Sequence, residues 1–274
     1  MCATCGCGND SGITIEVPGQ GHVHLHSHGD GHWHTHEGHT HEHSPTLADR
    51  HHEHDHGNSQ LLQLEADILH GNTLLAERNR GYFEALSVYA INLVSSPGSG
   101  KTTLLESTIR DLSGKLDIAV IEGDQQTSND AARIAKHKVS VIQINTGKMC
   151  HLDAGMVGTA AKSLLMKPHS ILFIENVGNL VCPAMFDLGE NSRVVVMSVT
   201  EGDDKAIKYP EMFRTSSLCL INKTDLLPYV EFDVTKAIDL ARRVNPKMQF
   251  IEMSATTGEG LGDWYNWLQE ARIT

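Results

Sequence analysis

The chain has 274 residues, of which 40% are hydrophobic, and its formal net charge is −12. This length and hydrophobic content allow one large α/β domain with an extension. The acidic balance argues against a nucleic-acid partner, and no apolar run reaches the roughly 18 residues that would span a membrane. Residues 1–7 contain neither a basic region nor an apolar stretch, so we expect no secretory signal and a cytoplasmic protein whose thiols stay reduced.

Residues 1–58, which we call the arm, differ in composition from the rest of the chain. Of the 18 histidines, 14 lie between His22 and His56, and the first 60 residues hold eight acids and one base. A polar, glycine-rich composition of this kind predicts disorder. Imidazoles at every second position of a mobile chain can wrap a borderline divalent metal ion. The candidate ligands are His22, His24, His26, His28, His32, His34 and His36.

Three cysteines, Cys2, Cys5 and Cys7, precede the histidines. A C-x-x-C pair can be a redox centre, but redox pairs normally open a helix after a strand, and no strand fits before Cys2. Three thiolates together with the Met1 amine offer four donors, and planar four-coordination suits Ni(II). We therefore favour a metal site at the amino terminus and keep the redox pair as the alternative.

From residue 59 to residue 274 the chain alternates helical and strand-like patterns. Two helices are expected over residues 59–69 and 72–86. Strands are expected over residues 90–94, 118–122, 139–145, 171–175, 194–199, 218–222 and 249–253, with helices beginning near residues 101, 128, 152, 203, 233 and 262. This alternation predicts an α/β domain with a doubly wound, mostly parallel sheet, in which ligands bind at the carboxyl ends of the strands.

A phosphate-loop pattern follows the first of these strands. Residues 95–102 read S-S-P-G-S-G-K-T, which is G-x-x-x-x-G-K-[ST] with Ser95 in place of the first glycine. The glycines let backbone N–H groups face a phosphate. Lys101 is expected to reach the β- and γ-phosphates, and Thr102 to bind Mg²⁺. The expected contact residues are Gly98, Ser99, Gly100, Lys101, Thr102 and Thr103.

The motif N-K-x-D at residues 222–225 ends a later strand. Asp225 supplies an acceptor for the ring N–H and exocyclic amine of guanine, while Asn222 would hold the loop and Lys223 would lie over the ring. Ser254 and Ala255 follow the last strand and would place a backbone N–H at the guanine carbonyl. Alone, N-K-x-D is a weak signal. Because it follows a phosphate loop in the chain, it predicts that the bound nucleotide is GTP and not ATP.

Two acidic residues complete the predicted nucleotide site. Asp124 follows the strand over residues 118–122 and is expected to reach the Mg²⁺ shell, and Glu175 ends the strand over residues 171–175. Gly178 gives E-x-x-G, and its N–H would contact the γ-phosphate, so this segment is expected to act as a switch. Asn179, not glutamine, follows it, which predicts slow intrinsic hydrolysis with no assigned residue for the attacking water. The expected catalytic residues are Lys101, Thr102, Asp124 and Glu175.

Cys150, His151 and Cys182 form a second group of metal-ligand types after strand ends. Singly, each would be interpreted as a core cysteine or an ordinary surface histidine. Jointly, beside a predicted nucleotide, they predict a metal site that takes zinc or nickel, which the sequence does not separate. Cys219 lies inside a predicted strand and is expected to be a core residue.

These motifs together resemble the HypB family of hydrogenase nickel-incorporation GTPases, within a wider group of metal-insertion GTPases. The matching stretches are residues 1–7, the histidine tract, residues 96–103, 150–151, 175–183 and 222–225, which span essentially the whole chain. The resemblance implies a tight nickel site at the amino terminus and a GTP-dependent homodimer. It also implies a HypA-type nickel chaperone as partner and delivery to the large-subunit precursor of a [NiFe] hydrogenase.

The sequence therefore predicts a cytoplasmic GTPase that binds nickel and uses GTP to order its transfer. One alternative is a urease-type or cobalamin-related GTPase of the same group, against which the C-x-x-C-G-C start argues. A second alternative is a nickel storage protein whose GTPase domain regulates release. The histidine tract suits storage, whereas the thiolate sites suit delivery.

Overall fold

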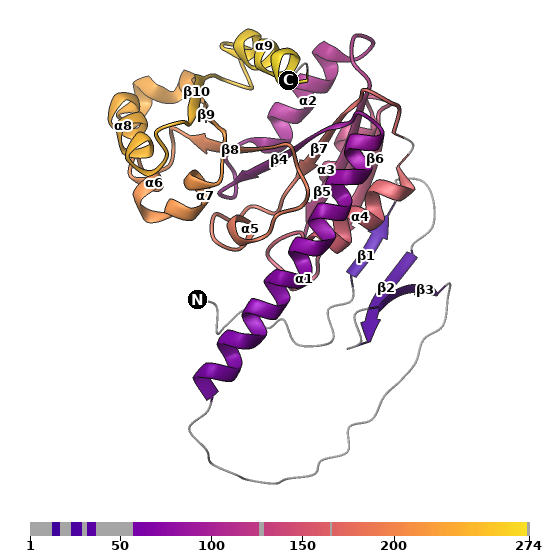
Figure 1. The fold of residues 1–274 in the computed structure, drawn as a ribbon. Helices are drawn as coiled ribbons and strands as arrows, with labels where there is room; N and C mark the ends of the chain where they lie inside the picture. The colour runs from indigo at the N-terminus through magenta and orange to yellow at the C-terminus, as the bar shows by residue number, and fades with distance from the viewer. Residues whose placement is uncertain are drawn as a thin grey trace.

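The computed structural model describes residues 13–16, 23–28, 32–36, 57–125, 129–164 and 166–272, with side chains described from residue 66 onward except that of Asn129. Seven parallel strands form the central sheet, in the spatial order β10-β9-β8-β4-β7-β5-β6 (Figure 1). They are β4 (Tyr89–Ser95), β5 (Ile118–Asp124), β6 (Ser140–Asn145), β7 (Ile171–Glu175), β8 (Ser192–Ser198), β9 (Leu218–Asn222) and β10 (Gln249–Glu252). The predicted parallel α/β sheet is confirmed, and each predicted strand agrees within two residues at either end.

Helices cover both faces of this sheet. One face packs against α2 (Lys101–Leu112), α3 (Asn129–Ala135) and α9 (Leu261–Ala271). The other face packs against α1 (Gly57–Ala85) and α4 (Ala154–Ser163) at one end, and against α7 (Pro210–Arg214) and α8 (Val234–Val244) at the other. The short helices α5 (Cys182–Met185), α6 (Lys205–Lys208) and the 3-10 helix η1 (Thr224–Tyr229) lie in the connections.

The alternation of side chains along the strands produces two buried layers. In β5, Ile118 and Val120 join the layer under α2, α3 and α9, whereas Ala119 and Ile121 face α1 and α4. Strands covered on both faces are mostly apolar, as is typical of parallel sheets. Polar residues therefore gather where the strands end, which is where the predicted motifs lie.

The two helices predicted before the first core strand are one helix, α1, of 29 residues. Gly71 separates the two apolar patterns, but glycine in a helix interior costs only about 1 kcal/mol relative to alanine. Contacts along the helix offset that cost, because Asn72 donates to the carbonyl of Asp187 and Asn79 donates to that of Leu188. None of the helices in the described ranges is long and apolar enough to cross a membrane.

Three further strands lie within the arm and extend the sheet antiparallel beyond β6. They are β1 (Ile13–Glu16), β2 (Val23–His28) and β3 (His32–His36). Alternation of period two is also a strand pattern, and the edge of β6 offers backbone groups with which β1 pairs. Cys2, Cys5, Cys7 and His22 lie outside the described residues, as do the side chains of His24, His26, His28, His32, His34 and His36.

Candidate nucleotide and metal sites

The phosphate loop joins β4 to α2 at the carboxyl edge of the sheet. Gly98 and Gly100 have φ angles of 73° and 100°, in the left-handed region that residues with a side chain rarely adopt. At Gly100 a Cβ would also lie 2.6 Å from Nδ2 of Asn222. The loop therefore needs glycine at these two positions of the motif, and it ends on the first turn of α2, where backbone N–H groups favour an anion.

Lys101 and Thr102 open α2, and both are held by side chains from neighbouring strands. The Nζ of Lys101 donates to Oγ of Ser95 at 2.7 Å, and Oγ1 of Thr102 donates to Oε1 of Glu175 at 2.7 Å. Burial lowers the pKa of Lys101, and the neighbouring carboxylates of Glu175 and Glu122 oppose this shift. Ser95, the departure from the motif, thus contacts the phosphate-loop lysine, a role that sequence reasoning did not give it.

Two buried carboxyl groups lie side by side behind the loop. Glu122 and Glu175 are paired across β5 and β7, and their exposed fractions are 2% and 3%. Burial, followed by the nearby Glu175 and Asp124, raises the pKa of Glu122 to about 9. Burial also raises the pKa of Glu175, against the pull of Lys101. Glu122 is not among the residues predicted for the site, although its charge within an otherwise apolar strand was an available signal.

The donors at this end of the sheet fit a hard cation such as Mg²⁺, which prefers oxygen ligands. Thr102 supplies a hydroxyl, and Asp124 and Glu175 supply carboxylates. Among the described residues, one oxygen of Glu122 and one of Glu175 are buried without a hydrogen-bond partner. Oδ1 of Asp124 accepts from the N–H of Gln125 at 2.7 Å.

Asn222 links the phosphate loop to the segment after β10. Its Nδ2 donates to the carbonyl of Ser99 at 2.9 Å, and its Oδ1 accepts from the N–H groups of Lys223 and Ala255 at 2.8 and 3.0 Å. The Nζ of Lys223 donates to the carbonyl of Gly98 at 2.7 Å. The N-K-x-D and S-A segments therefore meet beside the phosphate loop, although the Ala255 N–H contacts Asn222 instead of lying free for a base.

Asp225, the residue expected to recognise guanine, lies at the start of η1. Within the described part of the chain, its Oδ1 is buried without a hydrogen-bond partner. A buried carboxylate oxygen without a donor is costly, and a ligand that donates N–H groups would satisfy it. Ser254 is also buried, and its Oγ accepts from the N–H of Thr257 at 3.1 Å.

The segment from Glu175 to Gly178 packs directly on the phosphate loop. A Cβ at Gly178 would lie 3.0 Å from Cα of Pro97, so this close approach favours glycine. Asn179 accepts from the N–H of Val181 at 2.7 Å through its side-chain oxygen. That oxygen therefore holds its own turn, and the residue that positions the attacking water stays unassigned.

Cys150, His151 and Cys182 come together beside this segment. Their ligand atoms all lie within 4.8 Å of one another, and the two sulfur atoms are 2.9 Å apart, well beyond the roughly 2.0 Å of a disulfide bond. Cys182 begins α5, and Cys150 and His151 precede α4. The structure thus brings Cys182 next to the adjacent pair Cys150 and His151, although Cys150 and Cys182 are 32 residues apart in sequence.

His151 is buried and stacks on Phe186, with ring centroids 4.0 Å apart and planes at 25°. Burial lowers the pKa of His151 to about 4, so the imidazole is neutral near pH 7 and available to a metal. In the described ranges its Nδ1 has no hydrogen-bond partner. Two thiols and a neutral imidazole are soft and borderline donors, which suit zinc or nickel. Cys219 is buried in β9 with its pKa raised by burial to about 12, as a core residue should be.

Fold and site together define a phosphate-loop nucleotide-binding protein with a cluster of two cysteines and one histidine beside the Glu175–Gly178 segment. The family model described as "CobW/HypB/UreG, nucleotide-binding domain" matches residues 89–252. The hydrogenase maturation factor HypB of Escherichia coli K12 is 58% identical over 213 residues, covering 78% of this chain and 73% of that protein. The chain therefore belongs to the HypB hydrogenase maturation factors within the CobW/HypB/UreG family.

Two solved structures and an archaeal relative extend this likeness. The crystal structure of HypB from Helicobacter pylori in complex with nickel has a TM-score of 0.70 and 38% identity, covering 74% of this chain and 95% of that one. HypB from Archaeoglobus fulgidus has a TM-score of 0.68 and 41% identity, covering 73% and 98%. The probable hydrogenase maturation factor HypB of Methanocaldococcus jannaschii is 45% identical over 200 residues, 73% of this chain and 90% of that protein.

Proposed function

We propose that this protein is a GTP-hydrolysing nickel metallochaperone that delivers nickel during [NiFe] hydrogenase maturation. The observation that carries the proposal is the position of the Cys150–His151–Cys182 cluster, which adjoins the Glu175–Gly178 segment packed on the phosphate loop. A metal site in that place can respond to the presence of a γ-phosphate. The H. pylori relative solved in complex with nickel supports nickel as the cargo.

In the proposed reaction, GTP is bound by the phosphate loop and read at its base by Asp225. Lys101 neutralises charge on the β- and γ-phosphates, and Thr102 and Glu175 hold the oxygen-rich side of the pocket. Mg²⁺, when bound there, would neutralise charge on the β- and γ-phosphate oxygens. Because no glutamine follows Gly178, the turnover is expected to be slow.

Nickel is the transferred substrate in this proposal. Three protein donors leave a further coordination position for an incoming ligand, so a partner can take the metal by ligand exchange. Loss of the γ-phosphate changes the position of the Glu175–Gly178 segment. The affinity of the cluster for nickel changes with it. Zinc fits the same donors and is a competing occupant. The amino-terminal cysteines and the histidine tract of the arm would supply a second store of nickel.

The partners in this proposal come from the family resemblance. They are a HypA-type nickel chaperone, the hydrogenase large-subunit precursor and a second copy of this chain in a GTP-dependent homodimer, all in the cytoplasm. The hydrogenase maturation role of the curated relatives supports them.

The test is nickel-dependent hydrogenase activity in a strain that lacks this protein. The full chain should restore the activity, and a full chain with Cys150→Ala and Cys182→Ala should not, while GTP hydrolysis by the purified variant stays close to normal. Cys219→Ala is the matched control, because Cys219 is a buried cysteine of β9 that is not a member of the cluster. Full maturation by the double variant would refute delivery through this site.

A storage protein with a regulatory GTPase domain is the second candidate, favoured by the density of histidines in the arm. Replacing His22, His24, His26, His28, His32, His34 and His36 with asparagine in the full chain separates the two functions. Storage predicts lost nickel capacity with lost hydrogenase activity at low nickel. Delivery predicts lost capacity with maturation retained at the same low nickel.

A further inference from the structure

A buried polar network connects the nucleotide segment with both parts of the metal cluster. At its centre is Asn176, which directly follows Glu175 at the end of β7 and is 1% exposed. Its Nδ2 donates to Oδ1 of Asn92 at 3.3 Å. Its Oδ1 accepts from the N–H groups of Leu152 and Val177 at 3.2 and 3.0 Å. One side chain thus contacts two other segments of the chain, at Asn92 and Leu152, as well as its own.

The contact with Leu152 reaches the first two metal donors. Leu152 follows His151 directly, and its backbone N–H is held by Asn176 across 24 residues of sequence. The Leu152 side chain packs against β5 so closely that a Cβ at Gly123 would lie 2.8 Å from it. The Cys150–His151 segment is therefore positioned from the carboxyl ends of β5 and β7, where the acidic residues of the nucleotide site lie.

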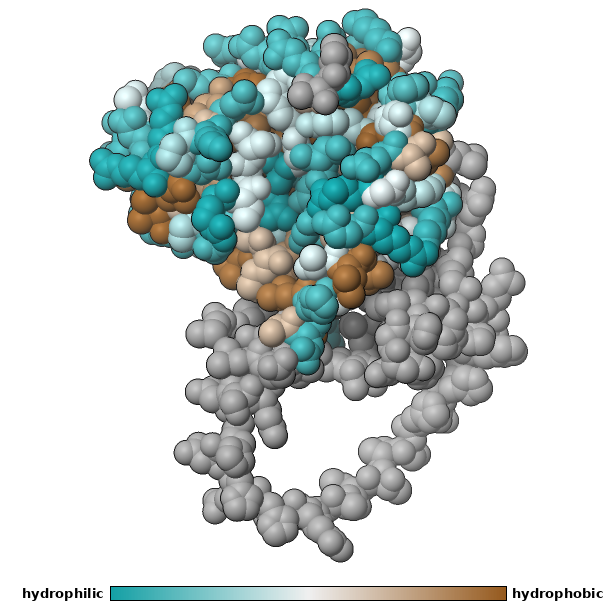
Figure 2. All heavy atoms as spheres, in the orientation of Figure 1, coloured by the Kyte–Doolittle hydropathy of each residue, from teal (hydrophilic) through white to brown (hydrophobic). Residues whose placement is uncertain are grey.

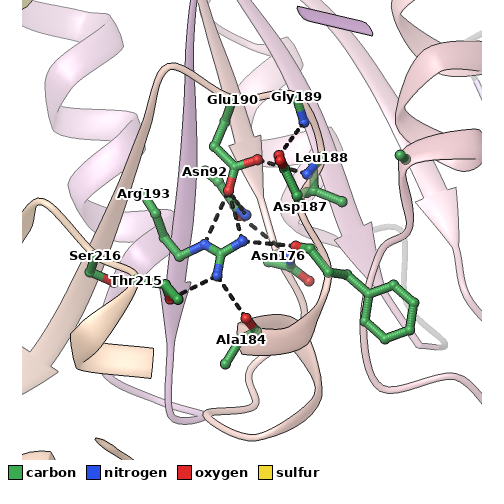
Figure 3. A network of polar contacts seen from close by, with 12 residues as sticks. Asn92, Asn176, Ala184, Asp187, Leu188, Gly189, Glu190, Arg193, Thr215 and Ser216 are labelled. Atoms are coloured by element: carbon green, nitrogen blue, oxygen red, sulfur yellow. Dashed lines mark hydrogen bonds and ion pairs between the residues drawn. The ribbon is translucent and has the colours of Figure 1, made fainter. Parts of the chain in front are cut away.

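The contact with Asn92 reaches the third donor (Figure 3). Nδ2 of Asn92 donates to Oε1 of Glu190 at 3.1 Å, and Glu190 forms an ion pair at 2.9 Å with Arg193, each side chain being 6% exposed. Arg193 donates to the carbonyls of Ala184 and Phe186 at 3.1 and 2.8 Å. Ala184 lies in the turn of α5 that Cys182 opens, and the side chain of Phe186 stacks on His151.

On the nucleotide side, Asn176 lies between two residues that touch the phosphate loop. Glu175 accepts from Thr102 at 2.7 Å, and Gly178 approaches Pro97. A shift of the Glu175–Gly178 segment on γ-phosphate binding therefore displaces Asn176, and with it the bond to the Leu152 N–H. Backbone hydrogen bonds alone do not provide this link, because the Asn176 N–H donates to Leu93 within the sheet at 2.9 Å.

We propose that Asn176 is the positioning residue that couples nucleotide state to metal affinity, by holding the Cys150–His151 segment through Leu152 and the Cys182 segment through Asn92. This inference rests on the proposed function, in which nucleotide controls the metal. Coupling between two sites is reciprocal and typically amounts to about 5–150-fold in affinity. Asn176 is predicted to carry most of that factor while binding neither ligand itself.

The test compares nickel dissociation constants with GDP and with a non-hydrolysable GTP analogue. The full chain carries Cys2→Ser, Cys5→Ser and Cys7→Ser, so that thiolate-to-nickel charge-transfer absorption reports the cluster alone. Asn176→Ala should bring the ratio of the two constants close to one. A merely structural role would weaken both constants equally and leave the ratio unchanged, and that result would overturn the proposal.

Asn245→Ala is the matched control, because this asparagine also uses its side-chain amide to hold carbonyls, those of Phe213 and Ser216, away from both sites. It should keep the wild-type ratio. If the parent protein itself shows a ratio of one, the proposed nucleotide control fails. If the parent shows a ratio above one that Asn176→Ala preserves, only the assignment of Asn176 fails.

Amide hydrogen exchange at Leu152 in the unsubstituted protein provides a test that does not depend on folding of a variant. Exchange protection of this amide should differ between the GDP state and the GTP-analogue state, since the bond to Asn176 changes with the segment. Equal protection in both states, in a protein whose nickel affinity does respond to nucleotide, would also overturn the proposal.

Discussion

The nucleotide pocket and the metal cluster share the carboxyl edge of one sheet but are built in different ways. The centre of the pocket is the phosphate loop, one continuous segment whose shape is set by backbone conformation, with positive φ angles at Gly98 and Gly100. The cluster joins Cys150 and Cys182, which are 32 residues apart, and its segments are held by buried side chains. A site of the first kind tolerates the loss of a side-chain contact, whereas a site of the second kind should depend strongly on its polar supports.

The largest loss of stability is expected at the buried ion pair that supports the metal cluster. Arg193→Ala should lower the free energy of unfolding by about 3–5 kcal/mol, because it leaves Glu190 as an unpaired buried carboxylate and frees the carbonyls around α5. Urea denaturation of the metal-free protein measures the loss.

The exposed ion pair between Arg214 and Glu211 serves as control, since its side chains are 62% and 60% exposed. Arg214→Ala should leave the urea midpoint essentially unchanged, as expected for a solvent-screened pair. If the two arginine variants were equally stable, the interpretation of the network in Figure 3 as a support would be wrong.

The next effect concerns pH and the buried imidazole of the cluster. The pKa of His151 is about 4 in the folded protein and about 6.5 in an unfolded chain, so the unfolded chain binds the proton first as pH falls. Stability of the metal-free protein should therefore be full above pH 6.5 and should decline between about pH 6.5 and 4, by up to about 3 kcal/mol.

His151→Phe keeps an aromatic ring against Phe186 and removes the titrating group. The difference in unfolding free energy between this variant and the parent should therefore grow in the variant's favour as pH is lowered from 6.5 towards 4, with a chelator present. A pH-independent difference would contradict a buried neutral imidazole.

On the nucleotide side, the strongest single-residue effect is expected at the base. Asp225→Asn removes a charged acceptor, and each hydrogen bond to a charged group contributes about 1.5–3 kcal/mol. GTP affinity should fall by that amount, and xanthine nucleotides should bind better than guanine nucleotides, because the new amide can donate to the xanthine carbonyl. Competition assays with both nucleotides measure the preference. Unchanged GTP selectivity would contradict the assignment of Asp225 as the residue that recognises guanine.

The same difference between the two sites explains which features could be predicted from the sequence. The parallel sheet was predictable because β4, β5, β7 and β9 are apolar runs bounded by polar residues, and buried parallel strands have no other pattern. The phosphate loop and N-K-x-D were predictable because each function depends on residues that are adjacent in the chain. The cluster of Cys150, His151 and Cys182 was predictable only from the order of strand ends, and the structure brings its members together.

The features that were missed depend on tertiary contacts. Glu122, Asn176 and Arg193 carry no motif, and their importance comes from burial and partners in distant segments. α1 was divided at Gly71 because local propensity was weighed without the contacts of Asn79 to α4 and to Leu188.

The smallest effect tests whether the departure from the phosphate-loop motif matters. Ser95 accepts from the Nζ of Lys101 at 2.7 Å, whereas the motif has a glycine without a side chain there. Ser95→Ala should destabilise the nucleotide-free protein by about 0.5–1.5 kcal/mol, the usual net contribution of one hydrogen bond. Bound GTP should remove most of this loss, since a phosphate becomes the partner of the buried ammonium group.

Thermal unfolding with and without nucleotide measures both parts of this expectation. Ser96→Ala is the control, because Ser96 accepts from Lys205 and does not hold the phosphate-loop lysine. A loss at Ser95 that persists in full with GTP bound would mean that Lys101 keeps Ser95 as a partner in both states. The hydroxyl would then be part of the nucleotide-bound pocket, and the pocket would depend on a side-chain support in the way the metal cluster does.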